Sequence, residues 1–141
     1  MTRRLPDWRE RLEAEVQRKA LSVFAWGVND CCLFACDLMR AMTGVDFAAA
    51  YRGRYATQLG AARALREIDD VASLSELLDL IAARDGWLEI APTVASSGDP
   101  VLAFATHGPT LGIRFGGFIA TPGEAGVELI PATLASRAWA L

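Results

Sequence analysis

Hydrophobic residues recur at a helical spacing over about the first 85 residues of the chain, and in short, strand-like runs after them. Trp8, Leu12 and Val16 lie four residues apart behind Asp7, which predicts an amphipathic helix of about 13 residues with its charged side chains in solvent. The stretch 30–42 is apolar nearly all round, as in helices that are buried in a core. A Thr-Gly pair at 43–44 ends this second helix.

Two more helices are predicted before the pattern changes. One covers 58–68, and the other opens with a capping box formed by Ser73 and Glu76 and runs to Arg84. From Trp87 onward, short apolar runs lie between Gly, Pro and Asp residues, which is typical of strands joined by tight turns. The predicted strands cover 87–90, 100–105, 111–115, 118–120 and 127–130, and the segment 138–141 is either a last strand or an anchor against the first helices.

Helices followed by strands predict an α+β fold in one domain, 1–141. We expect a helical part over about 7–85 and a mostly antiparallel sheet over about 87–141, with the helix 30–42 packed on the sheet. A chain of 141 residues with 52% hydrophobic and 22% charged residues has the composition of a globular domain.

Charge and hydropathy argue against two classes of partner. The net charge of −3 offers no electrostatic basis for binding nucleic acid, and no apolar run approaches the roughly 20 residues that span a bilayer. The opening Met-Thr-Arg-Arg leads into Pro6 and Asp7 rather than into an apolar run, so we expect no signal peptide. The protein is therefore expected to be made in the cytosol and to stay there, or to leave inside a larger particle.

Cys31 is the candidate for chemistry. Asn29 is predicted to cap the second helix, which places Cys31 in the first turn, where unpaired N–H groups and the helix dipole stabilise a thiolate. The alternative is that Cys31 is a small, soft residue of a buried helix, since free cysteines are among the most buried residues.

Cys31, Cys32 and Cys36 cluster within six positions. With His107 they offer the residue types of a zinc site, and by themselves the thiolates of an iron–sulfur cluster. No C-x₂-C loop is present, and adjacent cysteines on a helix point about 100° apart. We therefore expect no metal and no other cofactor, and an odd number of cysteines argues against a disulfide framework.

The sequence Tyr-Arg-Gly-Arg-Tyr at 51–55 connects two predicted helices. Two tyrosines and two arginines around a glycine could face a partner or an anionic ligand, which makes Tyr51, Arg52, Arg54 and Tyr55 candidate binding residues. The alternative is that the aromatic rings anchor this loop on the core of the domain itself.

Several segments together resemble one protein family. Trp26-Gly27 followed by Asp30-Cys31 is similar to the nucleophile segment of the NlpC-type papain-like cysteine peptidases. The longer strings Phe-Ala-Trp-Gly at 24–27, Asp-Cys-Cys-Leu-Phe at 30–34, Ala-Met-Thr-Gly at 41–44, Tyr-Arg-Gly-Arg-Tyr at 51–55 and Ala-Trp at 138–139 resemble a family of short NlpC-like proteins of uncharacterised function. Phages and prophages encode that family beside tail-assembly genes. The resemblance runs from about Asp7 to the end of the chain.

The resemblance implies a papain-like fold with Cys31 as the nucleophile, and it also locates two substitutions. Thr110 stands where the pattern has the histidine base, and Ala120 stands where it has the residue that orients the base. His107, the single histidine of the chain, lies just before that segment and is the remaining candidate base.

The resemblance supports two hypotheses. The chain is a tail-tip component that keeps the peptidase fold, is structural in tail assembly, and has other tail proteins as partners. Alternatively it is an active peptidase or amidase that cleaves the peptide stems of peptidoglycan during phage entry. Either implies synthesis in the bacterial host cytoplasm followed by incorporation into the virion tail. The Thr110 and Ala120 substitutions favour the first.

Overall fold

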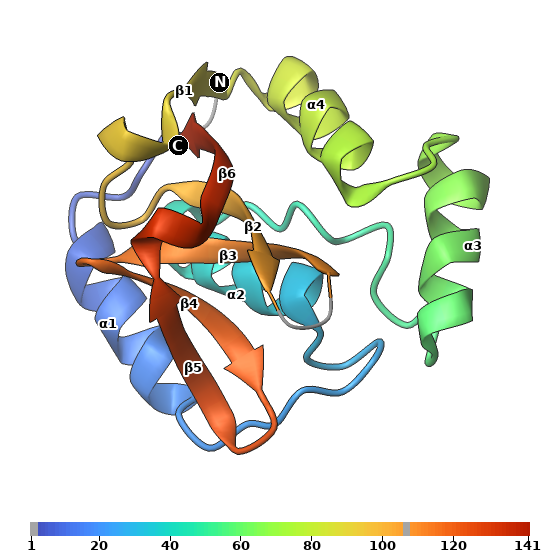
Figure 1. Cartoon of the computed structure of the whole chain (residues 1–141), viewed down its shortest axis with the longest axis horizontal. Helices are drawn as coiled ribbons and strands as arrows, with labels where there is room; N and C mark the ends of the chain where they lie inside the picture. Colours follow the sequence, from blue (N-terminus) through green and yellow to red (C-terminus); the bar gives the residue numbers. More distant parts are fainter. Residues whose placement is uncertain (1–2, 106–107) are drawn as a thin grey trace.

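The structure is a computed structural model, and it describes residues 3–105 and 108–141 of the chain. Four α-helices come first and a six-stranded sheet follows within these residues (Figure 1). The helices are α1 (Trp8–Arg18), α2 (Cys31–Thr43), α3 (Gln58–Asp69) and α4 (Leu74–Asp85). The fold is therefore α+β with the helices N-terminal, as the order of the sequence patterns predicted.

The strands form one sheet in which every neighbouring pair is antiparallel. They are β1 (Leu88–Ile90), β2 (Pro100–Ala105), β3 (Gly108–Phe115), β4 (Phe118–Gly123), β5 (Gly126–Pro131) and β6 (Ala135–Ala140). Their order across the sheet is β1-β6-β2-β3-β4-β5, so the last strand of the chain lies between the first two. The edges of the sheet are β1 and β5, and the backbone N–H of Val127 on β5 donates to the carbonyl of Ala20, just after α1.

The main core lies between the sheet and the helices. Leu102, Leu111, Ile113 and Trp139 point from the sheet into a cluster that contains most of α2. Residues adjacent to them in the strands point to the opposite face, where Val101, Ala103, Ile119, Ile130 and Ala138 form a smaller cluster with Ala95. α2 packs on β3 and β4 and beside α1, whereas α3 and α4 lie to one side of the sheet (Figure 1).

The predicted helices agree with the observed ones to within two residues at each end. The strand predicted at 100–105 is confirmed, and the others are observed at the predicted places but with longer or shifted ends. One predicted cap is wrong. The N-cap of α2 is Asp30 and not Asn29, because the Asn29 side-chain oxygen accepts from Lys19 and its amide nitrogen donates to the carbonyls of Ser22 and Val23.

Candidate functional site

The start of α2 is organised by the buried carboxylate of Asp30. One of its oxygens accepts the backbone N–H of Leu33 at 3.0 Å, which caps the helix. The other accepts the N–H of Gly27 at 3.0 Å and the hydroxyl of Tyr55 at 2.5 Å. The same side chain thus fixes the first helical residue, Cys31, the turn before the helix and the loop that follows it.

Gly27 allows the turn before α2 to touch that loop directly. Its φ of +76° lies in the left-handed region, and a Cβ at this position would lie 2.0 Å from the carbonyl oxygen of Tyr55. Only glycine fits both conditions, so Trp26-Gly27 and the backbone of Tyr55 form one wall beside Cys31.

The Cys31 side chain is partly exposed, and its sulfur receives hydrogen bonds from the backbone N–H groups of Leu111, on β3, and of Cys32. Burial among protein atoms, helped by Cys32 and Asp30, nevertheless raises the pKa of Cys31 to about 12. The N–H groups near the start of the helix do lower the pKa of Cys31, as expected, but burial raises it by more. Desolvation outweighs the two N–H donors, and Cys31 is a neutral thiol at pH 7.

The residues that stand at the two substituted positions are not bases. Thr110 lies next to Leu111, on the strand that touches the Cys31 sulfur, and its hydroxyl donates to the carbonyl of Gly108 at 3.1 Å. Ala120 on β4 is fully buried in the main core. His107, the candidate base, lies outside the described residues.

A pocket of about 210 Å³ opens beside Cys31. Its walls are formed by the first turns of α2, the segment around Tyr51 and Tyr55, and residues of α3 and α4, and Pro109 also lines it. Cys32 and Cys36 also line it. The sequence singled out several of these residues, but it gave no sign of a shared cavity, because the way in which consecutive helices pack against one another is not visible in a local pattern.

The four candidate binding residues have different surroundings. Tyr51 is buried and its hydroxyl donates to Asp69 at 2.6 Å, and Tyr55 is held by Asp30, so both rings anchor the loop on the domain itself. Arg52 is half-buried and pairs with Asp37 and Asp46. Arg54 is exposed. Contact of these residues with a partner stays a prediction.

Cys32 and Cys36 lie on the same face of α2, as their spacing predicted. A hydrogen bond between the two thiols, together with burial, raises the pKa of Cys32 well above its usual value. Among the described residues, no group of three or more His, Cys, Asp or Glu side chains is arranged to hold a metal ion.

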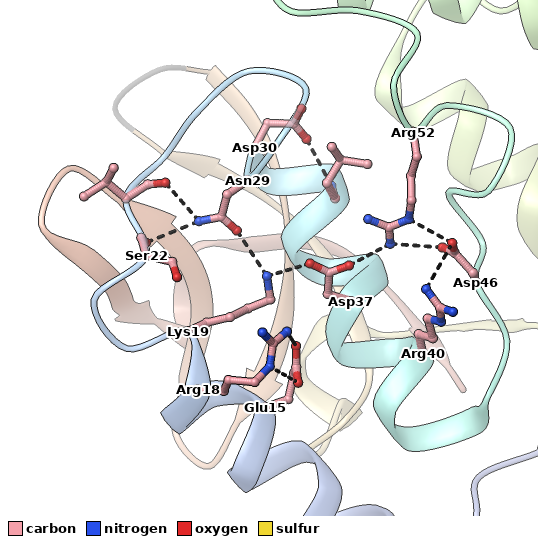
Figure 2. Close-up of polar contacts among 12 residues, drawn as sticks. Glu15, Arg18, Lys19, Ser22, Asn29, Asp30, Asp37, Arg40, Asp46 and Arg52 are labelled. Carbon is pink, nitrogen blue, oxygen red and sulfur yellow. Dashed lines mark hydrogen bonds and ion pairs between the residues drawn. The ribbon is translucent and has the colours of Figure 1, made fainter.

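A network of ion pairs connects α2 with the end of α1 and with the loop before α3 (Figure 2). Lys19 is buried and lies 2.5 Å from Asp37 on α2, and Arg52 contacts the other oxygen of Asp37 at 2.7 Å. Arg52 also binds Asp46, 2.8 Å away. The signal for this network was present in the sequence, since only Asp37 and Arg40 interrupt the apolar run of this helix, but the partners of Asp37 could not be identified from its position.

The comparisons with known proteins give one family. A family model described as Domain of unknown function (DUF6950) matches residues 3–141, nearly the whole chain. The search of curated proteins found no match to the chain. Within the described residues, no helix has both the length and the apolar character needed to cross a membrane.

Proposed function

We propose that the chain, which belongs to this family of unknown function, is a structural component of a phage tail. In this proposal it sits at the tail tip with other tail proteins, and it keeps an NlpC-like cysteine-peptidase fold without the hydrolytic chemistry. The resemblance of segments from 24 to 139 to NlpC-like proteins encoded beside tail-assembly genes supports the tail assignment. The α+β architecture, with Cys31 beginning a core helix that packs on the sheet, is compatible with it.

The observation that carries the loss of chemistry is the pairing of Cys31 with β3. A cysteine nucleophile needs a base within hydrogen-bond reach and a third group that orients the base. The Leu111 N–H touches the Cys31 sulfur, so the neighbouring Thr110 stands on the strand that would carry the base. A threonine hydroxyl does not take up a proton at neutral pH, and the methyl group of Ala120 cannot orient an imidazole.

The protonation state of Cys31 supports the same conclusion. The thiolate, and not the thiol, attacks a carbonyl carbon. With a pKa of about 12, Cys31 keeps its proton at the pH of the cytoplasm and of the cell envelope. A nucleophile in this state needs a base to remove the proton during attack.

One observation favours an active peptidase or amidase that cleaves peptidoglycan stems. Cys31 is the first residue of α2, and the N–H groups of Leu111 and Cys32 converge on its sulfur. Donors at the sulfur stabilise the thiolate, and N–H groups near Cys31 would receive the oxyanion of an acyl-transfer reaction. In this second candidate function Cys31 is the nucleophile and His107 the base.

Replacement of Cys31 in a phage that carries the gene separates the two functions. We expect Cys31→Ser particles to assemble normal tails and to infect at the wild-type level, while deletion of the gene removes or shortens the tails in electron micrographs. An active peptidase requires instead that Cys31→Ser lowers infection as far as the deletion does. The tail assignment itself fails if deletion leaves particles intact and mass spectrometry finds no copy of the protein in wild-type virions.

A further inference from the structure

The pocket beside Cys31 is apolar over nearly all of its surface. Its walls are built mainly from aromatic and aliphatic side chains, among them Trp26, Phe47, Leu65, Leu77 and Ile81. Protein interiors are close-packed, with few voids larger than a water molecule. A dry cavity of about 150 Å³ with an apolar lining already holds a benzene ring. The pocket, at about 210 Å³, has room for a larger apolar group.

The strongest polar groups in the walls are already engaged. The Asp30 carboxylate accepts hydrogen bonds from two backbone N–H groups and from the hydroxyl of Tyr55. The hydroxyl of Tyr51 donates to Asp69. The Cys31 thiol is neutral at pH 7. A group that enters the pocket finds no charged partner among these residues, so a charged or strongly polar group would lose its hydration without replacement.

The chemistry of the occupant follows from these walls. A peptide backbone brings N–H and C=O groups that must be paired when they are buried, whereas an alkyl chain brings none. Gln58, at the start of α3, is an exposed polar residue of the lining, so the polar end of a ligand can stay hydrated at this rim.

The wall made by α3 can shift, so that the pocket can accept alkyl chains of different length. Only Ala64 of this helix is buried, and its main helical neighbour is α4, at the side of the molecule (Figure 1). A wall with so little buried surface can shift at a low cost in free energy.

We propose that this pocket binds the unbranched alkyl chain of a small amphiphile, with the polar end left in solvent at the rim near Gln58. The site does not depend on tail assembly or on hydrolysis, and it goes beyond both proposed functions.

Calorimetric titration with decanoate, below its micelle-forming concentration, tests the site. We expect saturable binding of one decanoate per protein and none of decanedioate, because the second carboxylate would have to enter the apolar pocket. Ala61→Phe places a ring in the pocket and should weaken binding by about tenfold or more, which corresponds to about 1.4 kcal/mol. Ala83→Phe, the same change at an exposed position of α4 outside the lining, should leave the affinity unchanged.

A second measurement needs no pocket-filling variant. The indole N–H signal of Trp26, assigned with Trp26→Phe, should shift in NMR spectra during the titration, while that of Trp8, on α1 and outside the lining, should not. The proposal is overturned if wild-type protein shows no saturable binding, if decanedioate binds equally well, if both phenylalanine variants lose affinity alike, or if the Trp26 signal stays in place.

Discussion

Asp30 shows how much of the site depends on one residue. Its carboxylate caps α2, holds the turn at Gly27 and accepts the hydroxyl of Tyr55. It also adds a negative charge beside Cys31, which helps to keep that thiol protonated. The residue that positions the cysteine therefore also lowers its reactivity, unless a base is supplied from elsewhere.

Alkylation of Cys31 should be slow and should rise with pH. The pKa of about 12 leaves little thiolate at pH 7, and the higher nucleophilicity of a basic thiolate offsets only part of this. We expect iodoacetamide to modify Cys31 about tenfold to a hundredfold more slowly than a free model thiol at pH 7. Tandem mass spectrometry can separate Cys31 from Cys32. A rate above that of the model thiol, or a plateau near neutral pH, would show an activated thiolate.

The identity of the cap at α2 illustrates what could be predicted at this scale. Asn29 and Asp30 are both good cap residues, and the local pattern cannot choose between them. Contacts outside the helix decide, because the Asn29 oxygen accepts from Lys19 while its amide nitrogen donates to Ser22 and Val23, and the cap is left to Asp30. The raised pKa of Cys31 was missed for a related reason, since desolvation by distant segments is not visible in the helix sequence.

α2 is held by ion pairs as well as by apolar contacts. Asp37 lies between Lys19, at the end of α1, and Arg52, in the loop before α3 (Figure 2). The side chain of Lys19 is only 8% exposed and that of Asp37 19%. Charges shielded from water to this degree depend on one another for compensation.

Asp37→Asn should therefore destabilise the protein by about 3 kcal/mol, because it leaves Lys19 and Arg52 facing a neutral amide. Asp70→Asn is the matched control. It removes the charge from an exposed pair with Arg66 and should change the free energy of unfolding by about 0.5 kcal/mol or less. Urea denaturation measures both variants, and equal effects would mean that the network at Asp37 adds no more than a surface pair.

At the scale of elements, helices and strands could be predicted where the signal is local. Ser73 and Glu76 mark the start of α4, and the Ser73 hydroxyl does accept the N–H of Glu76. The start of β3 was placed too late, because Gly108 and Pro109 lack strand propensity and belong to the strand only through their pairing with β2. The position of β6 between β1 and β2 is set by long-range packing, which no local pattern encodes.

Burial raises the pKa of several thiol and phenol groups in the folded protein. The pKa of Cys31 is raised to about 12, and those of Tyr51 and Tyr55 are also raised, first by burial and then by their carboxylate partners. Unfolded Cys and Tyr side chains lose their protons near pH 8.5 and pH 10. Above these values the unfolded state binds fewer protons than the folded state, so stability must fall as pH rises.

We expect the free energy of unfolding to be nearly constant from pH 7 to 8 and to decrease at higher pH. Cys31 by itself should account for a loss of about 2 kcal/mol at pH 10. Urea denaturation at pH 7, 9 and 10 follows the change. Cys31→Ala should reduce the slope between pH 8.5 and 10 without abolishing it, because the pKa of Cys32 is raised as well. An unchanged slope in that variant would show that Cys31 titrates alike in both states.

The two edge strands of the sheet affect how the protein can associate with other molecules at high local concentration. One edge, β1, is only three residues long, and the other, β5, is crossed by the chain at Ala20, whose carbonyl oxygen would lie 2.0 Å from a Cβ on Gly126. Long, free strand edges invite neighbouring chains to add strands, which leads to open-ended polymerisation. Here β1 is short, and the edge of β5 is interrupted at its start, where the N–H of Val127 donates to Ala20. Crowding should therefore bring these molecules together through their side chains, in contacts that can be specific and finite, rather than through a growing β-sheet.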